Sequence, residues 1–289
     1  MTASAVLQPA PADGLVRRRV HPPVGVLLAM AVLAALLVIG LAPGAFTSYD
    51  PLQGDPLSSL QAPSAAHPFG TDQLGRDVLS RVLHGAQYSL SLGLLATAIG
   101  LVGGIVLGVA AGYSRGLADR LISRFLDILL AFPEVLLALI LITVLGPGMS
   151  SVIWAVGIGR IPGAARLVRS QVLQVRRSSY VSSAVGLGLP SLTVVARHVV
   201  PNSLGPVLVN SVLGVGVCII FGASLSFLGL GAVPPTPEWG LMLSEARQYL
   251  SLAPWVSVWP GVFITLTVVS VTVTGRWWQQ SVVSRRRSL

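Results

Sequence analysis

The chain has 289 residues, of which 53% are hydrophobic and only 10% are charged, and its mean hydropathy is +0.78. Soluble globular domains carry about 25% charged residues, so this composition indicates an integral membrane protein. Lysine is absent, and arginine supplies all 19 residues of the Lys and Arg total. The missing lysine excludes both a Walker A phosphate-binding loop and Schiff-base catalysis.

Six apolar runs are long enough to cross about 30 Å of hydrocarbon. They cover residues 24–41, 88–112, 125–145, 152–168, 204–228 and 255–274. The fourth run contains Arg160, Pro162 and Arg166, so we expect its cytoplasmic end to be irregular or buried in protein. The sequence therefore predicts an all-α integral membrane protein with six transmembrane helices.

The arginines orient these spans. With the N-terminus inside, 16 of the 19 arginines are cytoplasmic and only Arg76, Arg81 and Arg247 lie outside, as the positive-inside rule requires. Both termini are therefore predicted to be cytoplasmic, and the formal charge of +9 reflects this asymmetry rather than a nucleic-acid partner. Residues 16–42 also resemble a signal peptide, but their apolar run is too long and lacks an A-x-A site, so we expect an uncleaved anchor.

These spans divide the chain into five parts. We expect a cytoplasmic tail (1–23), a first helix (24–42), an extracytoplasmic segment (43–84), a core with five further helices (85–275) and a basic cytoplasmic tail (276–289). Trp277 and Trp278 in the last part are typical of an interfacial anchor.

The extracytoplasmic segment contains the stretch HPFGTDQLGRDVLSR, residues 67–81. Glycines 70 and 75 predict two turns, Thr71 or Asp72 could cap the structure after them, and a short amphipathic helix is expected from Asp77. Two interpretations stay open: a capped interfacial loop, or a docking surface for an external partner. The docking surface would use Gly70, Thr71, Asp72, Gly75, Arg76 and Asp77.

A serine-rich segment, residues 178–206, separates the fourth and fifth apolar runs. Apolar residues recur every fourth position on either side of Gly188 and Pro190, which predicts two short amphipathic helices joined by a turn. Ser178 or Ser179 could cap the first helix, and Pro201 with Asn202 is expected to end the second. Such a hairpin could rest on anionic lipid or insert into a groove on another protein, and periodicity alone does not decide.

The segment resembles the cytoplasmic coupling loop, or EAA loop, of binding-protein-dependent ABC importer permeases of the dipeptide and oligopeptide class. Further stretches are similar to the same family and occur in its order: residues 67–81, LDILLAFPEVLLALILITVLGPG (126–148), ARLVRSQVLQVR (165–176), ASLSFLGLGAVPPTPEWGLML (223–243) and APWVSVWPG (253–261).

The resemblance implies the type I ABC importer permease fold in a bacterial plasma membrane. It further implies a heterodimer with a second permease subunit, an extracytoplasmic binding protein and cytoplasmic P-loop ATPases that bind ATP and Mg²⁺, so no catalytic residue or cofactor is expected in this chain. The implied cargo is dipeptides or oligopeptides, with nickel or metal-opine complexes as the alternative. An ion-driven secondary transporter and a membrane-embedded protease are less favoured, because the sequence shows neither internal repeats nor a catalytic constellation.

The resemblance places the coupling loop within residues 171–202. The residues it assigns to the ATPase contact are Tyr180, Ser182, Ser183, Ala184, Gly188, Arg197, His198, Pro201 and Asn202. The family usually has Glu-Ala-Ala where this chain has Ser182-Ser183-Ala184, so a charge that could pair across the ATPase interface is missing.

Two acids fall in or near the third apolar run. Asp127 and Glu134 are seven residues apart and are expected on about the same helix face, with Pro133 available to kink the helix. An acid in a span usually faces a cavity or a partner. Glu134, and less favourably Asp127, could therefore line the pathway and attract a peptide ammonium group, or either could pair with an arginine at the interface.

Two remaining patterns carry less weight. The histidines are scattered at positions 21, 67, 84 and 198 without ligand spacing, so no metal site is expected. The small residues Gly104, Gly108 and Gly112 permit close helix contact, either within this subunit or against the second permease.

Overall fold

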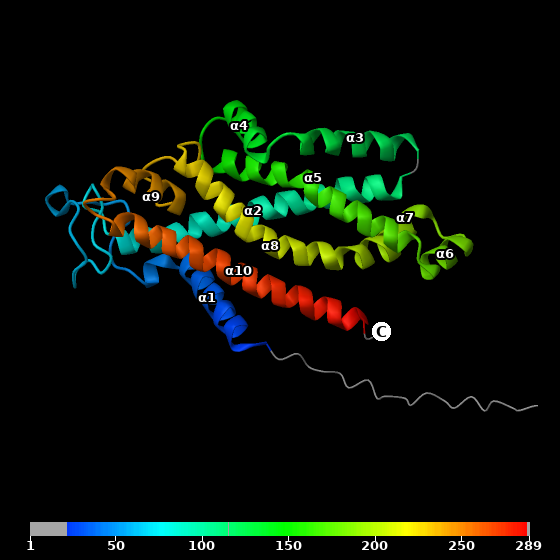
Figure 1. Cartoon of the computed structure of the whole chain (residues 1–289), viewed down its shortest axis with the longest axis horizontal. Helices are drawn as coiled ribbons and strands as arrows, with labels where there is room; N and C mark the ends of the chain where they lie inside the picture. Colours follow the sequence, from blue (N-terminus) through cyan, green and yellow to red (C-terminus); the bar gives the residue numbers. More distant parts are fainter. Residues whose placement is uncertain (1–21, 115, 288–289) are drawn as a thin grey trace, which may run out of the picture.

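The computed structural model of the chain describes residues 22–114 and 116–287, with side chains to residue 281 (Figure 1). Its helices are α1 (Val24–Leu41), α2 (Val78–Tyr113), α3 (Leu117–Ala131), α4 (Glu134–Leu145), α5 (Met149–Arg176), α6 (Ser179–Gly186), α7 (Ser191–Val194), α8 (Val200–Phe227), α9 (Trp239–Ala246) and α10 (Trp255–Arg287). Within this part of the chain the only β-pairing is two isolated bridges. Most of the predicted tail at 1–23 and the side chains of Arg285 to Arg287 lie outside the described residues.

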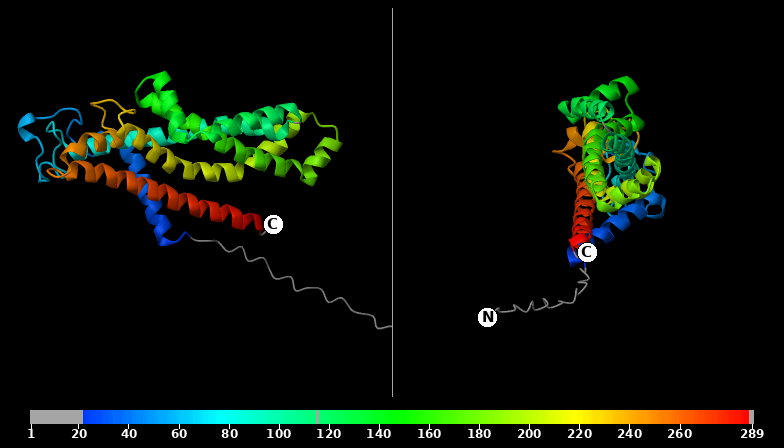
Figure 2. Two further views of the ribbon diagram at one scale, coloured as in Figure 1. Left: turned by 45° about the horizontal axis from the view of Figure 1, so that its top comes forward. Right: turned by 90° about the vertical axis from the view of Figure 1, so that its right-hand side faces the viewer.

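The long helices form an elongated bundle with different structures at its two ends. α2, α5 and α8 pack together at the centre, and α1 packs against α10 at the edge (Figure 2). The loops of residues 42–77 and the segment with α9 lie at one end, and α6 and α7 lie at the other (Figure 1). We call the first end, residues 42–81 and 228–254, the polar cap, and residues 178–199 the hairpin.

Five helices are long and apolar enough to cross a membrane, or six if the bent pair α3 and α4 forms one span. The prediction of a single third helix is wrong, because α3 and α4 meet at 95° across Phe132 and Pro133. Proline lacks an amide hydrogen and forces the preceding residue out of the helical region, and Phe132 accordingly has an extended ψ of 137°. Asp127 and Glu134 therefore lie on different helices and do not share a face.

The fourth span is a continuous helix. Of the two alternatives predicted for its cytoplasmic end, irregular or buried in protein, the second is observed, because Ala165, Val168 and Val172 are buried. α5 runs unbroken through Pro162, which is buried. Arg160 lies eleven residues after Met149, about 17 Å along the helix axis, and so belongs to the middle of the span rather than to its cytoplasmic end. Continuous packing against α2 supports the helix where Pro162 removes a backbone hydrogen bond.

The glycine run of α2 lies against α5 of the same subunit. A Cβ added at Gly108 would lie 2.5 Å from the Cβ of Val168, and one at Gly112 would lie 2.8 Å from Cγ1 of Val172. Gly104 faces Ala164 even more closely. Of the two explanations left open by the sequence, contact within the subunit is therefore the one observed.

The hairpin contains the predicted two helices, and Gly188 has the expected left-handed φ of +79° in the turn. Ser178 is the N-cap residue of α6, but its hydroxyl donates to the carbonyl of Val175 instead of capping. The predicted helix end at Pro201 and Asn202 is wrong, since α7 continues through a π-turn (Val195–Val199) into α8. The amide of Val200 bonds to the carbonyl of Val195, and this wider spacing accommodates the proline ring.

Candidate functional site

The polar cap is held together by buried ion pairs within the segment of residues 67–81 and between this segment and α9. Arg76 donates to Asp72 at 2.6 Å and to Glu245 at 3.3 Å, while Arg81 donates to Glu245 at 3.1 Å and lies 3.4 Å from Asp72. Arg76, Arg81 and Asp72 are at most 2% exposed. Two arginines and two acids thus neutralise one another and join the segment of residues 67–81 to α9.

Both predicted turns of this segment are present. Gly70 and Gly75 have φ of +73° and +70°. A Cβ at Gly70 would lie 2.6 Å from both the carbonyl oxygen of Gln61 and Nε1 of Trp255, and one at Gly75 would overlap the backbone of Asp55. Glycine is therefore required at both positions by conformation and by space.

The helix predicted from Asp77 is present, but it is longer than predicted and has a different cap. Asp72 accepts from the amides of Leu74 and Arg76 in the turn that follows it. Asp77, rather than Thr71 or Asp72, caps the helix by accepting from the amide of Ser80 at 2.6 Å. Its other carboxylate oxygen is 2.9 Å from Nδ1 of His67. The capped helix is α2, which has 36 residues and enters the bundle without a break.

The docking prediction for residues 70–77 rests on side chains that the fold buries. Thr71, Asp72, Arg76 and Asp77 are at most 2% exposed, because each bonds within the cap. Leu74 at the tip is exposed. The buried side chains build the loop, and docking of an external partner at the exposed tip stays a prediction.

The sequence analysis missed a further buried acid in the cap, Glu238, which is 1% exposed. Glu238 accepts from the amides of Gly240 and Leu241 at the start of α9 and from the hydroxyl of Ser89 in α2. Burial raises the pKa of Glu238, against the opposing effect of the two backbone amides. Trp239 beside it is fully buried and donates from its indole to the carbonyl of Val82. The sequence signal that could have identified Glu238 is its position directly after three closely spaced prolines.

A cleft of about 300 Å³ opens where the broken pair α3 and α4 meets the bundle. Residues from α2, α5 and α8 complete its wall, and its lining contains Thr97, Leu101, Leu130, Phe132, Glu134, Arg160, Asn210 and Ser211. We call it the α4 cleft. Residues on both sides of the 95° break between α3 and α4 form one wall of the cleft. A straight third helix would not turn α4 away from α3 and would not form this wall.

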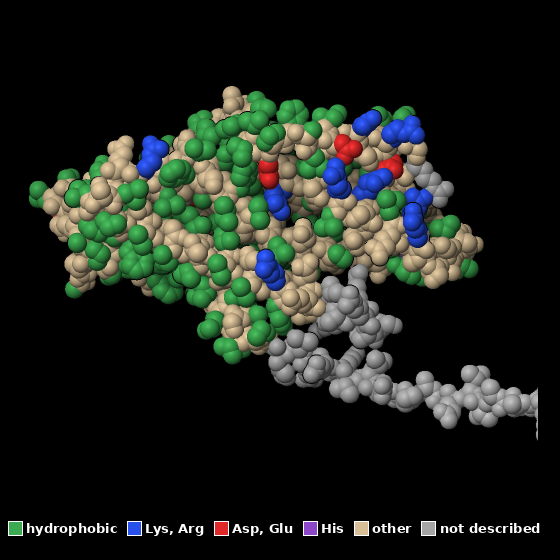
Figure 3. Space-filling model, viewed as in Figure 1, with side chains coloured by type: hydrophobic (Ala, Val, Ile, Leu, Met, Phe, Trp, Pro, Cys, Tyr) green, Lys and Arg blue, Asp and Glu red, His purple; other side chains and the backbone are tan. Residues whose placement is uncertain are grey.

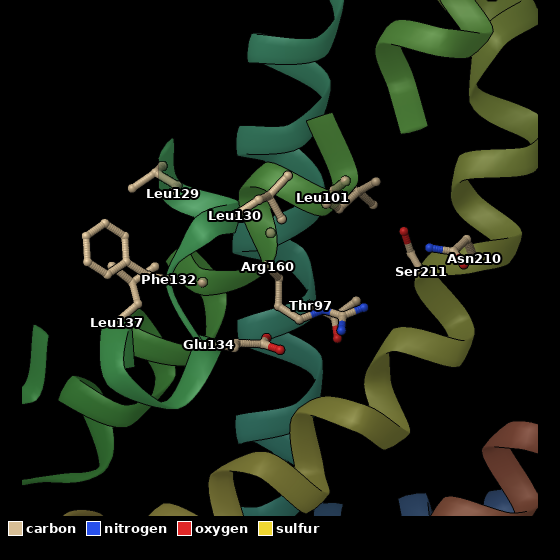
Figure 4. A pocket seen from close by; sticks show the side chains of 14 residues that line it. Thr97, Leu101, Leu129, Leu130, Phe132, Glu134, Leu137, Arg160, Asn210 and Ser211 are labelled. Carbon is tan, nitrogen blue, oxygen red and sulfur yellow. The ribbon is translucent and has the colours of Figure 1, made fainter. Parts of the chain in front are cut away.

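Two opposite charges point into the α4 cleft (Figure 4). Glu134 is the first residue of α4, and Arg160 extends from the middle of α5 with Thr97 beside its guanidinium. Within the described side chains, neither forms an ion pair. Glu134 is thus placed in the cleft, while its pairing with an interface arginine is not observed among these residues.

Asp127 lies outside the lining of this cleft. It accepts from Arg166 at 2.7 Å in a pair whose side chains are 54% and 62% exposed. About two turns further from the break, Asp119 accepts two hydrogen bonds from Arg169, at 2.9 and 3.0 Å. The pairing alternative thus describes Asp127 in this structure, and the two pairs fasten α3 to α5.

The hairpin places the predicted coupling residues together at one end of the bundle. Val181 and Ala184 are buried against a cluster that includes Val194 and Val199, whereas Tyr180, Ser182, Ser183 and Arg197 are exposed. Gly188, Pro201 and Asn202 are exposed as well, and His198 is half-buried. Asn202 donates to the carbonyl of His198 at 2.7 Å, so these two residues also shape the junction with α8.

Large apolar side chains are nevertheless exposed on the hairpin. Leu187 and Leu192 are 84% and 80% exposed, and Val185 and Leu189 are also exposed. Directly before the hairpin, the end of α5 is fastened to the end of α2. The guanidinium of Arg176 lies 5.5 Å from the ring centre of Tyr113 and donates to the carbonyls of Gly112 and Tyr113. Figure 3 shows that most charged side chains of this face gather over the same end of the molecule.

No group of three or more His, Cys, Asp or Glu residues in the described part of the chain could hold a metal ion. The only cysteine of the sequence, Cys218, is buried in α8.

Comparison with known proteins gives the family. Residues 104–288, more than half of the chain, match the family of binding-protein-dependent transport system inner membrane components. The chain belongs to this family. As in other inner membrane components of such transport systems, its several apolar helices make it a multi-pass membrane protein.

Two relatives are similar to this chain in sequence, and one solved structure is similar to it in fold. The dipeptide transport system permease protein DppC of Alkalihalophilus pseudofirmus is 39% identical over 86% of this chain and 82% of its own length. The glutathione transport system permease protein GsiD of Pectobacterium atrosepticum is 45% identical over 74% of this chain and 71% of its own. The inward-facing MetNI methionine ABC transporter has the same fold, with a TM-score of 0.55 at 19% identity over 69% of this chain and 95% of that chain.

The family resemblance seen in the sequence is therefore confirmed, as is the all-helical membrane fold. The charged residues whose contacts sequence reasoning missed are arginines and acids that bond across the fold or line the cleft, namely Arg81, Arg160, Arg166, Arg169, Glu238 and Glu245. From the sequence, the arginines in this set, Arg81, Arg160, Arg166 and Arg169, served only to orient the spans in the membrane. Their contacts are long-range: Arg166 and Arg169 bond to acids 39 and 50 residues away, and Arg81 bonds to an acid 164 residues away.

Proposed function

We propose that this chain is a pore-forming subunit of an ATP-driven importer that carries dipeptides or short oligopeptides into a bacterial cell. The names of the two relatives support a peptide cargo over nickel or metal-opine complexes. The chain would have no catalytic activity of its own, and ATP with Mg²⁺ would bind to partner ATPase subunits.

The observation that carries the proposal is the hairpin. Its buried residues pack in one cluster with Val168 and Val172 of α5, yet it exposes Leu187 and Leu192 almost completely. Helix-in-groove recognition uses such apolar anchors on a short helical element. Because Ser182 stands where the resembling family has glutamate, the contact of this hairpin with an ATPase would rest on apolar burial more than on charge pairing.

The remaining partners derive from the same assignment. A second permease would pair with this subunit, and an extracytoplasmic protein would deliver the peptide to the end formed by the polar cap. The hairpin end would face the cytoplasm together with both termini, since 16 of 19 arginines fall on that side or in the spans that lead to it. The hairpin lies at the opposite end from the cap (Figure 1).

The test is purification of the tagged chain from its native membrane in mild detergent, with identification of its partners by mass spectrometry. We expect a second six-helix permease, a P-loop ATPase and a peptide-binding protein, and ATP hydrolysis that rises when dipeptide and binding protein are added. Recovery with a binding protein specific for a metal complex would overturn the cargo. Recovery of the chain alone, with gradient-driven uptake, would overturn the importer assignment itself.

A further inference from the structure

The α4 cleft holds two opposite charges that come from different helices and do not pair with each other. Glu134 begins α4 directly after the break at Pro133, and Arg160 lies at mid-depth in α5. Charged groups in a membrane span are costly and normally face a partner or a water-filled cavity. Both side chains face the cleft (Figure 4).

The surrounding backbone leaves space for both groups. A Cβ at Gly214 of α8 would lie 3.1 Å from Nη2 of Arg160, so a larger residue there would press on the guanidinium. A Cβ at Gly159 would lie 3.6 Å from Cγ of Glu134. The guanidinium therefore reaches across the cleft toward α8, where Asn210 and Ser211 add polar side chains to the lining (Figure 4).

We propose that Glu134 and Arg160 form a two-charge contact for a zwitterionic substrate, a short peptide with a free ammonium group and a free carboxylate. The inference rests on the proposed peptide import and names the substrate class that this cleft selects. The carboxylate of Glu134 would accept from the ammonium group, and the guanidinium of Arg160 would donate to the terminal carboxylate.

Size and charge agree with this occupant. An extended dipeptide is about 7 Å long, and a cleft of about 300 Å³ lies at the lower end of the volumes seen for small-molecule sites. A guanidinium presents donors in a fork that matches a carboxylate, and an acid at a helix N-terminus is stabilised in its charged form by the helix dipole. The zwitterion would therefore satisfy both charges without leaving a net charge in the span.

The test uses the complete purified complex in proteoliposomes with saturating binding protein. Uptake of labelled dialanine is compared with uptake of N-acetyl-dialanine, which lacks the ammonium group, and of dialanine amide, which lacks the carboxylate. Each variant is compared with wild type for the same peptide, so that any preference of the binding protein cancels.

We expect Glu134→Gln to lower dialanine uptake by roughly tenfold or more, the fold-change for loss of one charge-assisted hydrogen bond. The same variant is expected to leave N-acetyl-dialanine uptake at its wild-type value. Arg160→Gln should show the matching pattern with dialanine amide. Equal fractional losses for free and blocked peptides would overturn the proposal.

The double variant Glu134→Gln with Arg160→Gln separates substrate contact from a structural ion pair. If the two charges only balance each other, removing both restores wild-type uptake; if they contact the zwitterion, the loss is at least as large as in either single variant. This variant leaves neither Glu134 nor Arg160 as an unpaired charge, so it can be tested even if a single variant does not assemble.

The matched control is Asp127→Asn with Arg166→Gln, which neutralises an exposed pair outside the cleft and is expected to change uptake by less than about twofold. A wild-type complex that takes up no dialanine would instead overturn the proposed peptide import.

Discussion

The polar cap and the hairpin both connect membrane helices, yet they treat their side chains in opposite ways. The cap buries charged residues, with Arg81 1% exposed and paired to Asp72 and Glu245. The buried residues of the hairpin are all apolar, namely Val181, Ala184, Val194 and Val199. Both ends expose large apolar side chains, with Leu57 of the cap 92% and Leu187 of the hairpin 84% exposed. The comparison therefore separates an end that is fastened by buried ion pairs from an end that is fastened by apolar packing alone, and exposed apolar residues at either end are available to a partner.

The largest expected effect is loss of the central arginine of the cap. Arg81→Met leaves Glu245 and Asp72 with one cation instead of two, and breaking a buried ion pair costs about 3–5 kcal/mol. The measurement is the midpoint of thermal unfolding of the purified chain in detergent. Arg247→Met, at an exposed arginine of the same cap, is the control and should lie within about 0.5 kcal/mol of wild type. Equal midpoints for the two variants would mean that the ion pairs do not hold the cap together.

The turn at Gly75 should show the next largest effect. Gly75→Ala places a Cβ on a left-handed residue and against the backbone of Asp55, which we expect to destabilise the cap by about 1–3 kcal/mol. Unfolding of the variant is compared with that of Gly44→Ala, because Gly44 has open space around it. If both substitutions had the same effect, the tight packing of this turn would not matter to stability.

Substitutions in the hairpin should weaken association with a partner while leaving the stability of the subunit nearly unchanged. Leu187→Glu with Leu192→Glu is expected to change stability by less than about 0.5 kcal/mol, because both side chains are already exposed. It should weaken association with the ATPase by about tenfold or more, as loss of apolar anchors does. Co-purified ATPase per permease is the readout, with Leu252→Glu at the cap as the matched control. Undiminished association would show that the hairpin docks through other residues.

The smallest effect concerns the pH dependence of the cap. Because burial raises the pKa of Glu238, the folded state favours its protonated form, and its contribution to stability is full below the ordinary glutamate pKa of about 4.3 and declines as pH rises above it. Glu238→Gln removes this titration while keeping an oxygen that can accept from an α9 amide. We expect unfolding midpoints measured from about pH 4 to pH 8 to fall less with pH in the variant than in wild type.

The sequence by itself determined the membrane class, the all-helical fold, the family and the placement of most spans. Val24–Leu41 is found where the hydropathy predicted it, and the turns at Gly70, Gly75 and Gly188 have the left-handed backbone that glycine permits. These features depend on composition, apolar length and local backbone preference, which are properties of short stretches of chain.

Only the tertiary structure decided the path of the third span, the continuity of α5 and the partners of the charged residues. Proline shows this most clearly: Pro133 accompanies a 95° break, while Pro162 and Pro201 lie within continuous helices. The difference depends on what packs around each ring and on whether another hydrogen-bond spacing, such as the π-turn before Val200, is available. Likewise, Glu134 and Arg160 meet at one cleft because α4 turns away at the break, and no local pattern in the sequence records that meeting.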